Sequence, residues 1–136
     1  MPQPYEWAAL RVVPRVDRGE FVNAGIVLYC QQLDFLAARI ELSADRGRAL
    51  DPDLDLDLVG RHLDAIVALC SGELSAGPNA NRPAGERFRW LVAPRSTVVQ
   101  PSLVHPGLTD DPAAELDRLV ARVVSVPGRE PHRESR

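Results

Sequence analysis

Two apolar runs separated by a short polar turn, at residues 5–13 and 21–29, place the strongest constraint on the fold of this chain. In the first run, apolar side chains occupy both alternating faces, and in the second the even-numbered residues 22–28 are all apolar. Alternation with a period of two is typical of β-strands. Pro14 ends the first run, because proline cannot donate a hydrogen bond to a neighbouring strand. The pattern predicts a β-hairpin with a loop of about five or six residues.

The middle of the chain combines a third apolar run with a helical pattern. Residues 35–42 alternate as a strand would, although their alanine content leaves a helix as an alternative. Residues 44–58 are polar and predict irregular structure. From residue 57, apolar side chains recur at spacings of three and four, with Asp55 or Asp57 as N-cap and Gly72 as the stop. These features predict a helix.

The last third of the chain predicts a loop, two strands and a helix. The loop covers residues 71–85, which are rich in Gly, Pro, Asn and Ala, and the strands cover residues 87–93 and 97–100. A helix should begin with Asp111 as N-cap and Pro112 as its first residue and end before Pro127.

This order of elements predicts an α+β fold: a mainly antiparallel sheet of about four or five strands, with two principal helices on one face. We expect one domain over residues 1–125 and a disordered C-terminal tail over residues 126–136.

Composition narrows the classes of function. The formal net charge is −3, which argues against a general nucleic-acid binder, and all 16 basic residues are Arg. Without lysine, no Schiff base or Walker-type phosphate site can form.

Cys30 and Cys70 stand apart in apolar runs and are expected to be buried, free thiols. Residues 1–7 have no signal-peptide pattern, and no apolar run approaches a membrane span, so we expect a cytoplasmic protein.

The first candidate site is the polar turn between the two hairpin strands. It gathers three arginines, two acids and an amide, and the candidate residues among them are Arg11, Arg15, Arg18, Glu20 and Asn23. Guanidinium groups bind carboxylate and phosphate oxygens, so the turn predicts an anion-binding or partner-binding site. The alternative is a structural network in which the acids pair with the arginines and brace the hairpin.

The second candidate site follows Pro94, at the expected end of a strand. Its guanidinium groups, hydroxyls and neighbouring polar groups suit a phosphate or carboxylate. The alternative is that the hydroxyls satisfy only local turn hydrogen bonds. The candidate residues here are Arg89, Trp90, Arg95, Ser96, Thr97 and Gln100.

Metal, cofactor and catalytic motifs are absent from the sequence. The acidic run 51–57 has Leu56 and His62 where a calcium-binding EF-hand needs Gly and Glu. The histidines are scattered and show no zinc spacing. His105 is a candidate binding residue and a possible base, but it has no identifiable nucleophile partner. We therefore expect no metal, no cofactor and no catalytic residues.

Two segments of the chain, residues 11–28 and 87–102, resemble a bacterial family described as domain of unknown function 3037. Their sequences are RVVPRVDRGEFVNAGIVL and RFRWLVAPRSTVVQPS. The resemblance implies no activity, because the family has none established. It does imply a setting, since genes of the family are thought to lie beside one for a protein similar to the HipA kinases of toxin–antitoxin systems.

Two hypotheses follow from these observations. The first is a non-enzymatic accessory protein that binds a protein partner, such as a HipA-like kinase, through the Arg-rich turn. The second is a binder, or an enzyme, that holds a phosphate-bearing small molecule where Arg11, Arg15, Arg89 and Arg95 converge, with Glu20 or His105 moving a proton. Neither hypothesis involves a membrane.

Overall fold

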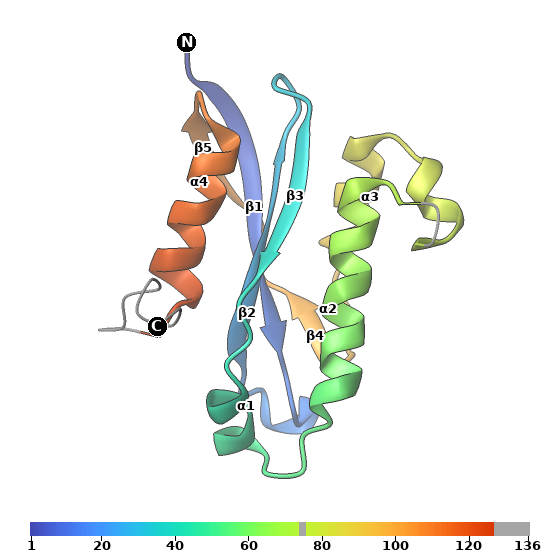
Figure 1. The fold of residues 1–136 in the computed structure, drawn as a ribbon, viewed down its shortest axis with the longest axis vertical. Coiled ribbons are helices and arrows are strands. Elements are labelled where there is room, and N and C mark those ends of the chain that lie inside the picture. Colours follow the sequence, from blue (N-terminus) through green and yellow to red (C-terminus); the bar gives the residue numbers. More distant parts are fainter. Residues whose placement is uncertain (74–75, 127–136) are drawn as a thin grey trace, which may run out of the picture.

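The computed structural model describes residues 1–73 and 76–126. Its centre is a five-stranded antiparallel sheet in which β3, β2, β1 and β4 lie in that order, and β5 also pairs with β1 (Figure 1). With the helices around it, this sheet confirms the α+β fold class. The strands are β1 (Gln3–Val12), β2 (Val22–Cys30), β3 (Phe35–Ile40), β4 (Val99–Pro101) and β5 (His105–Thr109).

The predicted hairpin is confirmed as β1 and β2, which pair from Glu6 and Tyr29 to Val12 and Val22. The register shifts by one residue after Leu10, so the strands bulge there. A short 3-10 helical turn, η1 (Val16–Arg18), forms part of the connection. The third run is a strand, β3, which settles the alternative left open for residues 35–42.

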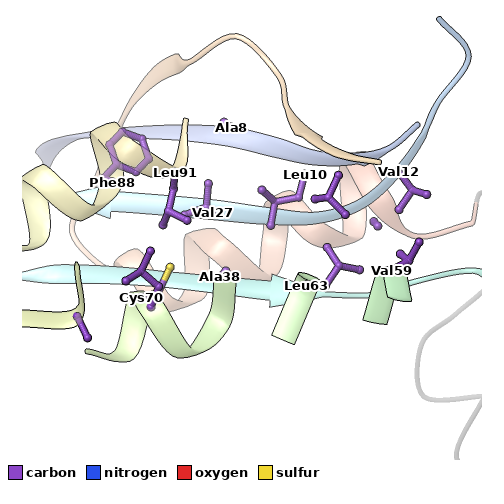
Figure 2. Close-up of a cluster of buried hydrophobic side chains, with 14 residues drawn as sticks. Ala8, Leu10, Val12, Val27, Ala38, Val59, Leu63, Cys70, Phe88 and Leu91 are labelled. Atoms are coloured by element: carbon purple, nitrogen blue, oxygen red, sulfur yellow. The ribbon is translucent and has the colours of Figure 1, made fainter. Parts of the chain in front are cut away.

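The two long helical segments cover opposite faces of the sheet, so the prediction that both lie on one face is wrong. One core cluster joins α2 (Leu56–Ser71) and α3 (Ala84–Leu91) to Leu10 and Val27, and Figure 2 shows it. The other joins α4 (Pro112–Leu119) to Ile26 and Leu28. Because β1 and β2 carry apolar side chains on both faces, each face needs a helix to exclude water.

The N-cap and C-cap residues of α2 are those that the sequence predicts. Asp55 accepts a hydrogen bond from the backbone N–H of Leu58, and Gly72 ends the helix in the left-handed conformation that favours glycine. A second helix, α1 (Ala44–Leu50), precedes it, with Ser43 as N-cap. The prediction of irregular structure over residues 44–58 is therefore wrong for residues 44–50 and 56–58, because Ser43 and Asp55 each start a helix within that polar segment.

The predicted strand at residues 87–93 is a helix, α3. Phe88 and Leu91, three residues apart, are buried together, whereas Trp90 is half-exposed. Pro83 precedes the first turn of this helix. The apolar residues of the segment fit both the two-residue period of a strand and the 3.6-residue period of a helix, and the burial of Leu91 together with Phe88 identifies the helix. The predicted loop over residues 71–85 also contains a short 3-10 turn, η3 (Pro78–Asn81).

The C-terminal part of the described chain contains one strand that the sequence did not predict. β5 includes Pro106 and Gly107, two residue types with low β-strand propensity, yet the strand pairs with Gln3–Trp7 of β1. α4 begins with Asp111 as N-cap and Pro112 as first residue, as predicted, and continues into one π-helical turn, η4 (Val120–Val124). The predicted tail from residue 127 onward lies outside the described residues.

Two further predictions concern the cysteines and the membrane. Cys30 and Cys70 are free and buried, which confirms their predicted role as core residues. Burial raises the pKa of the Cys70 thiol to about 12. No helix in the described parts of the chain is long and apolar enough to cross a membrane.

Candidate functional site

The arginines of the hairpin turn pair mainly with acids. Arg18 binds Glu20 through two hydrogen bonds, with Nε 2.6 Å from Oε1, and the guanidinium lowers the pKa of the Glu20 carboxyl. Arg15 lies 3.7 Å from a carboxylate oxygen of Asp51, just after α1. These contacts fit the alternative in which the turn is a structural ion-pair network.

Arg11 and Asn23 face each other on β1 and β2, beside the bulge. The guanidinium carbon of Arg11 lies 4.1 Å from the centre of the Phe21 ring, and Asn23 donates to the Val123 carbonyl of η4. Within the described residues, Arg11 Nε and Asn23 Oδ1 have no hydrogen-bond partner and are buried. Asn23 therefore joins the sheet to the end of the C-terminal helical segment, on the face that α4 covers.

Arg89 and His105 lie near the other end of β1. Arg89 binds both carboxylate oxygens of Glu6, at 2.5 and 3.0 Å, and so ties α3 to β1. The His105 ring packs on the Trp7 ring, with 4.6 Å between centroids. Arg11, Arg15 and Arg89, which were expected to converge with Arg95, instead contact Phe21, Asp51 and Glu6 in different places.

A different group of polar side chains meets in a cavity of about 420 Å³ between α2 and the segment that joins α3 to β4. One wall is a single stripe of α2, at spacings of three and four residues. The six residues of this stripe are Leu58, Arg61, His62, Ala65, Ile66 and Leu69.

The opposite wall of this cavity, which we call the α2 pocket, comes from the end of α3, the following loop and β4. Its residues are Trp90, Leu91, Arg95, Thr97 and Val99, and Ala76 and Asn79 complete the lining. Three predicted site residues, Trp90, Arg95 and Thr97, thus come together here. Of the other predictions in this segment, Ser96 does not line the pocket, and Gln100 donates to the Thr97 carbonyl.

Backbone carbonyls and an aromatic ring hold the Arg95 guanidinium in place. Its Nη2 donates to the Trp90 carbonyl at 2.5 Å and its Nε to the Ala93 carbonyl at 3.3 Å. The guanidinium carbon lies 4.7 Å from the centre of the Trp90 ring. A guanidinium has five N–H donors, so three remain for a ligand. Because the group is already oriented, binding an anion costs little further side-chain entropy.

The electrostatics of the α2 pocket favour an anion. Arg61 and Arg95 both line it, neither forms an ion pair with the described residues, and no described Asp or Glu is part of the lining. Six other arginines in the described chain have a carboxylate partner. The two pocket arginines therefore contribute a charge of +2 to the lining.

Sequence reasoning missed Arg61 and His62. The apolar spacing at residues 57–70 indicates the buried face of the helix, which includes Val59 and Leu63, and does not indicate its flank. The signal that could have found the pocket is a second stripe on the flank of the same helix, in which apolar residues from Leu58 to Leu69 surround Arg61.

Metal chemistry has no evident site in the described chain. Across residues 1–73 and 76–126, no group of three or more His, Cys, Asp and Glu side chains is arranged to hold a metal ion. His62 and His105 lie in different places, and His132 lies outside the described residues.

The fold and the α2 pocket define a small α+β domain with a cationic, largely apolar hollow beside its sheet. The chain belongs to the family of proteins of unknown function DUF3037, whose profile matches residues 7–124, and this confirms the resemblance seen in the sequence. Neither the curated proteins nor the solved structures gave a significant match.

Proposed function

We propose that this protein is a non-enzymatic binding domain whose α2 pocket holds a phosphate-bearing small molecule. The observation that carries the proposal is the meeting of Arg61 and Arg95 in a concave cavity of about 420 Å³, with no carboxylate in the described lining. Cavities of about 300–1,000 Å³ are typical of small-molecule sites. Guanidinium forks are the side chains best matched to phosphate oxygens.

The pocket suits a small molecule better than an added β-strand. β4 is the neighbouring edge, but Pro101 has no N–H to offer, and the Val99 carbonyl already accepts a hydrogen bond from the Thr97 hydroxyl at 2.8 Å. A peptide that extends a sheet needs a row of free backbone groups. A compact ligand needs only the side chains of the lining.

The test is a thermal-shift screen with inorganic phosphate, nucleotides and phosphorylated metabolites. A ligand at about 100 times its Kd adds about 2.7 kcal/mol, which raises the Tm of a domain of this size by several degrees. Arg61→Gln and Arg95→Gln should remove the shift. The matched control is Arg122→Gln, which changes an arginine of η4 on the opposite face. A screen without shifts, or shifts that persist in both pocket variants, would contradict the proposal.

We propose, as a second candidate, that the protein binds a partner similar to HipA kinases. The observation that favours it is the exposure of Leu103 and Leu108, at 84% and 70%, before and on β5. Large apolar side chains that stay exposed to water are candidates for a protein interface.

The partner proposal has its own test. The double substitution Leu103→Ser and Leu108→Ser should weaken binding to a purified HipA-like kinase in calorimetry by at least about tenfold. Val16→Ser, in η1, is the control, because Val16 is also exposed but η1 follows the end of β1 that does not pair with β5. Equal binding by wild type and the double variant would contradict this surface as the interface.

We also propose a bacterial, cytoplasmic protein. The two free, buried thiols of Cys30 and Cys70 suit a reducing compartment. The oxidation state of Cys30 and Cys70 in cell extracts, measured by thiol alkylation and mass spectrometry, tests the cytoplasmic location. A disulfide-bridged or oxidised form would contradict that location.

A further inference from the structure

The α2 pocket contains far more apolar than charged side chains, and this limits the rest of its ligand. Besides Arg61 and Arg95, the lining includes Leu58, Ile66, Leu69, Leu91 and Val99. A sugar phosphate would place several hydroxyls against these side chains, where they would lose hydrogen bonds to water without gaining others. An apolar body would instead gain from burial there.

Trp90 adds an aromatic surface to the same wall. Its residue is 49% exposed, although tryptophan is a large apolar side chain that proteins usually bury more fully. The ring contacts the Arg95 guanidinium and also lines a smaller neighbouring hollow of about 260 Å³. A half-exposed indole beside an oriented guanidinium can stack with a flat ring while the guanidinium binds an attached anion.

The charge of the lining matches a phosphate monoester. Such a group carries about −1.5 to −2 at pH 7, and the two arginines supply +2. Arg61 comes from α2 and Arg95 from the facing loop, so a phosphate between them would receive donors from both walls. Thr97 also lines the pocket, and its hydroxyl donates to the Val99 carbonyl on the second wall.

We propose that the ligand of the α2 pocket is a phosphate monoester of an aromatic or otherwise apolar alcohol, held by Arg61 and Arg95 with its ring against Trp90. This inference rests on the proposed function and names the chemical class of the ligand. It distinguishes an amphipathic dianion from inorganic phosphate, from sugar phosphates and from uncharged aromatic compounds.

Isothermal calorimetry with four probes tests the inference: 1-naphthyl phosphate, inorganic phosphate, glycerol 3-phosphate and 1-naphthol. We expect 1-naphthyl phosphate to bind at least about tenfold more tightly than each of the other three, since each lacks the ring or the anion. Arg61→Gln should weaken 1-naphthyl phosphate by about tenfold or more, and the control Arg122→Gln should leave its Kd within about twofold.

Trp90→Ala isolates the contribution of the ring. It should weaken 1-naphthyl phosphate about tenfold while changing inorganic phosphate by about twofold or less, and Trp90→Phe should restore most of the loss. Far-UV circular dichroism establishes that each variant is folded before its Kd is compared.

The possible failures separate the two proposals. If all three phosphate compounds bind equally and depend on Arg61, the ligand class is wrong and the phosphate site stands. If 1-naphthol binds as tightly as 1-naphthyl phosphate, the pocket does not select an anion, and the ligand class is also wrong. If no phosphate compound binds, both proposals are overturned.

Discussion

Phe88→Ala should be one of the most destabilising single substitutions in this protein, and it tests whether residues 84–91 form a helix. Phe88 is fully buried among α2, α3 and the sheet, and its ring packs on Tyr29 with 5.4 Å between centroids. Removing a buried phenyl ring loses its transfer free energy and leaves a cavity, at a cost of about 3–5 kcal/mol. That is a large part of the roughly 5–15 kcal/mol that stabilises a typical domain.

Trp90→Ala is the matched comparison, two residues further along. In a helix, Phe88 and Trp90 point in different directions, and Trp90 is 49% exposed. Its removal leaves no closed cavity, so we expect a cost of about 2 kcal/mol or less. In a strand the two residues would share a face, and their substitution would cost similar amounts.

Urea unfolding followed by far-UV circular dichroism measures both costs without depending on tryptophan fluorescence. The two costs differ by at least about 1 kcal/mol, so with a slope of about 1–3 kcal/mol per molar urea, Phe88→Ala should lower the midpoint by at least about 0.3 M more than Trp90→Ala does. Equal losses for the two variants, or a larger loss for Trp90→Ala, would refute the helical assignment and its core.

Three further predictions concern stability. Gly25→Ala should destabilise the protein by about 1–3 kcal/mol, because a Cβ there would lie 2.7 Å from a carbonyl oxygen of β3. Gly60→Ala, in open space within α2, should stabilise it by about 0.5–1 kcal/mol in the same urea assay. A stabilising effect of Gly25→Ala would contradict the close approach of the two strands. Burial and the hydrogen bond to Glu115 raise the pKa of Tyr5 to about 12, so the neutral phenol stabilises the fold fully below pH 10. That contribution is lost as pH rises through about 12, and the advantage of wild type over Tyr5→Phe should shrink between about pH 9 and pH 12; a constant difference would contradict it. Asp111→Ala should cost about 1 kcal/mol by removing the N-cap of α4, and no change in Tm would contradict that role.

Local signals in the sequence predicted much of the fold. The alternation at residues 5–13 and 21–29 gives the central hairpin, and Asp55, Gly72 and Asp111 mark helix ends through contacts with their own neighbours in the chain. Such features need no knowledge of tertiary structure, because the interacting groups lie within a few residues of each other.

The errors arose where distant contacts decide the structure. In α3, the Arg87 guanidinium donates to the Leu69 and Cys70 carbonyls, which lie 18 and 17 residues away at the end of α2, and Phe88 enters the core. Distant partners therefore fix the conformation of this segment. β5 forms because the first strand is long enough to pair with two short segments in turn. No local pattern contains that information.

The candidate site was predicted in part for the same reason. The sequence selected Trp90, Arg95 and Thr97 because they follow one another around a proline, but it could not select Arg61, which reaches the pocket from α2. It also expected Arg11 and Arg89 to meet, whereas their partners are Phe21 and Glu6 respectively. Convergence of side chains depends on how the helices pack on the sheet, which composition and spacing do not determine.

The most direct measurement of the central claim is a titration of the ¹⁵N-labelled protein with inorganic phosphate, followed through backbone and arginine Nε–H signals in ¹H–¹⁵N spectra. Phosphate bound in the α2 pocket should shift the signals of Arg61, Arg95 and Thr97 in a saturable way, and Arg61→Gln should abolish the response. Shifts centred on Arg15 and Arg18 of the hairpin turn, or spread evenly over the surface arginines, would contradict the assignment of the pocket as the binding site.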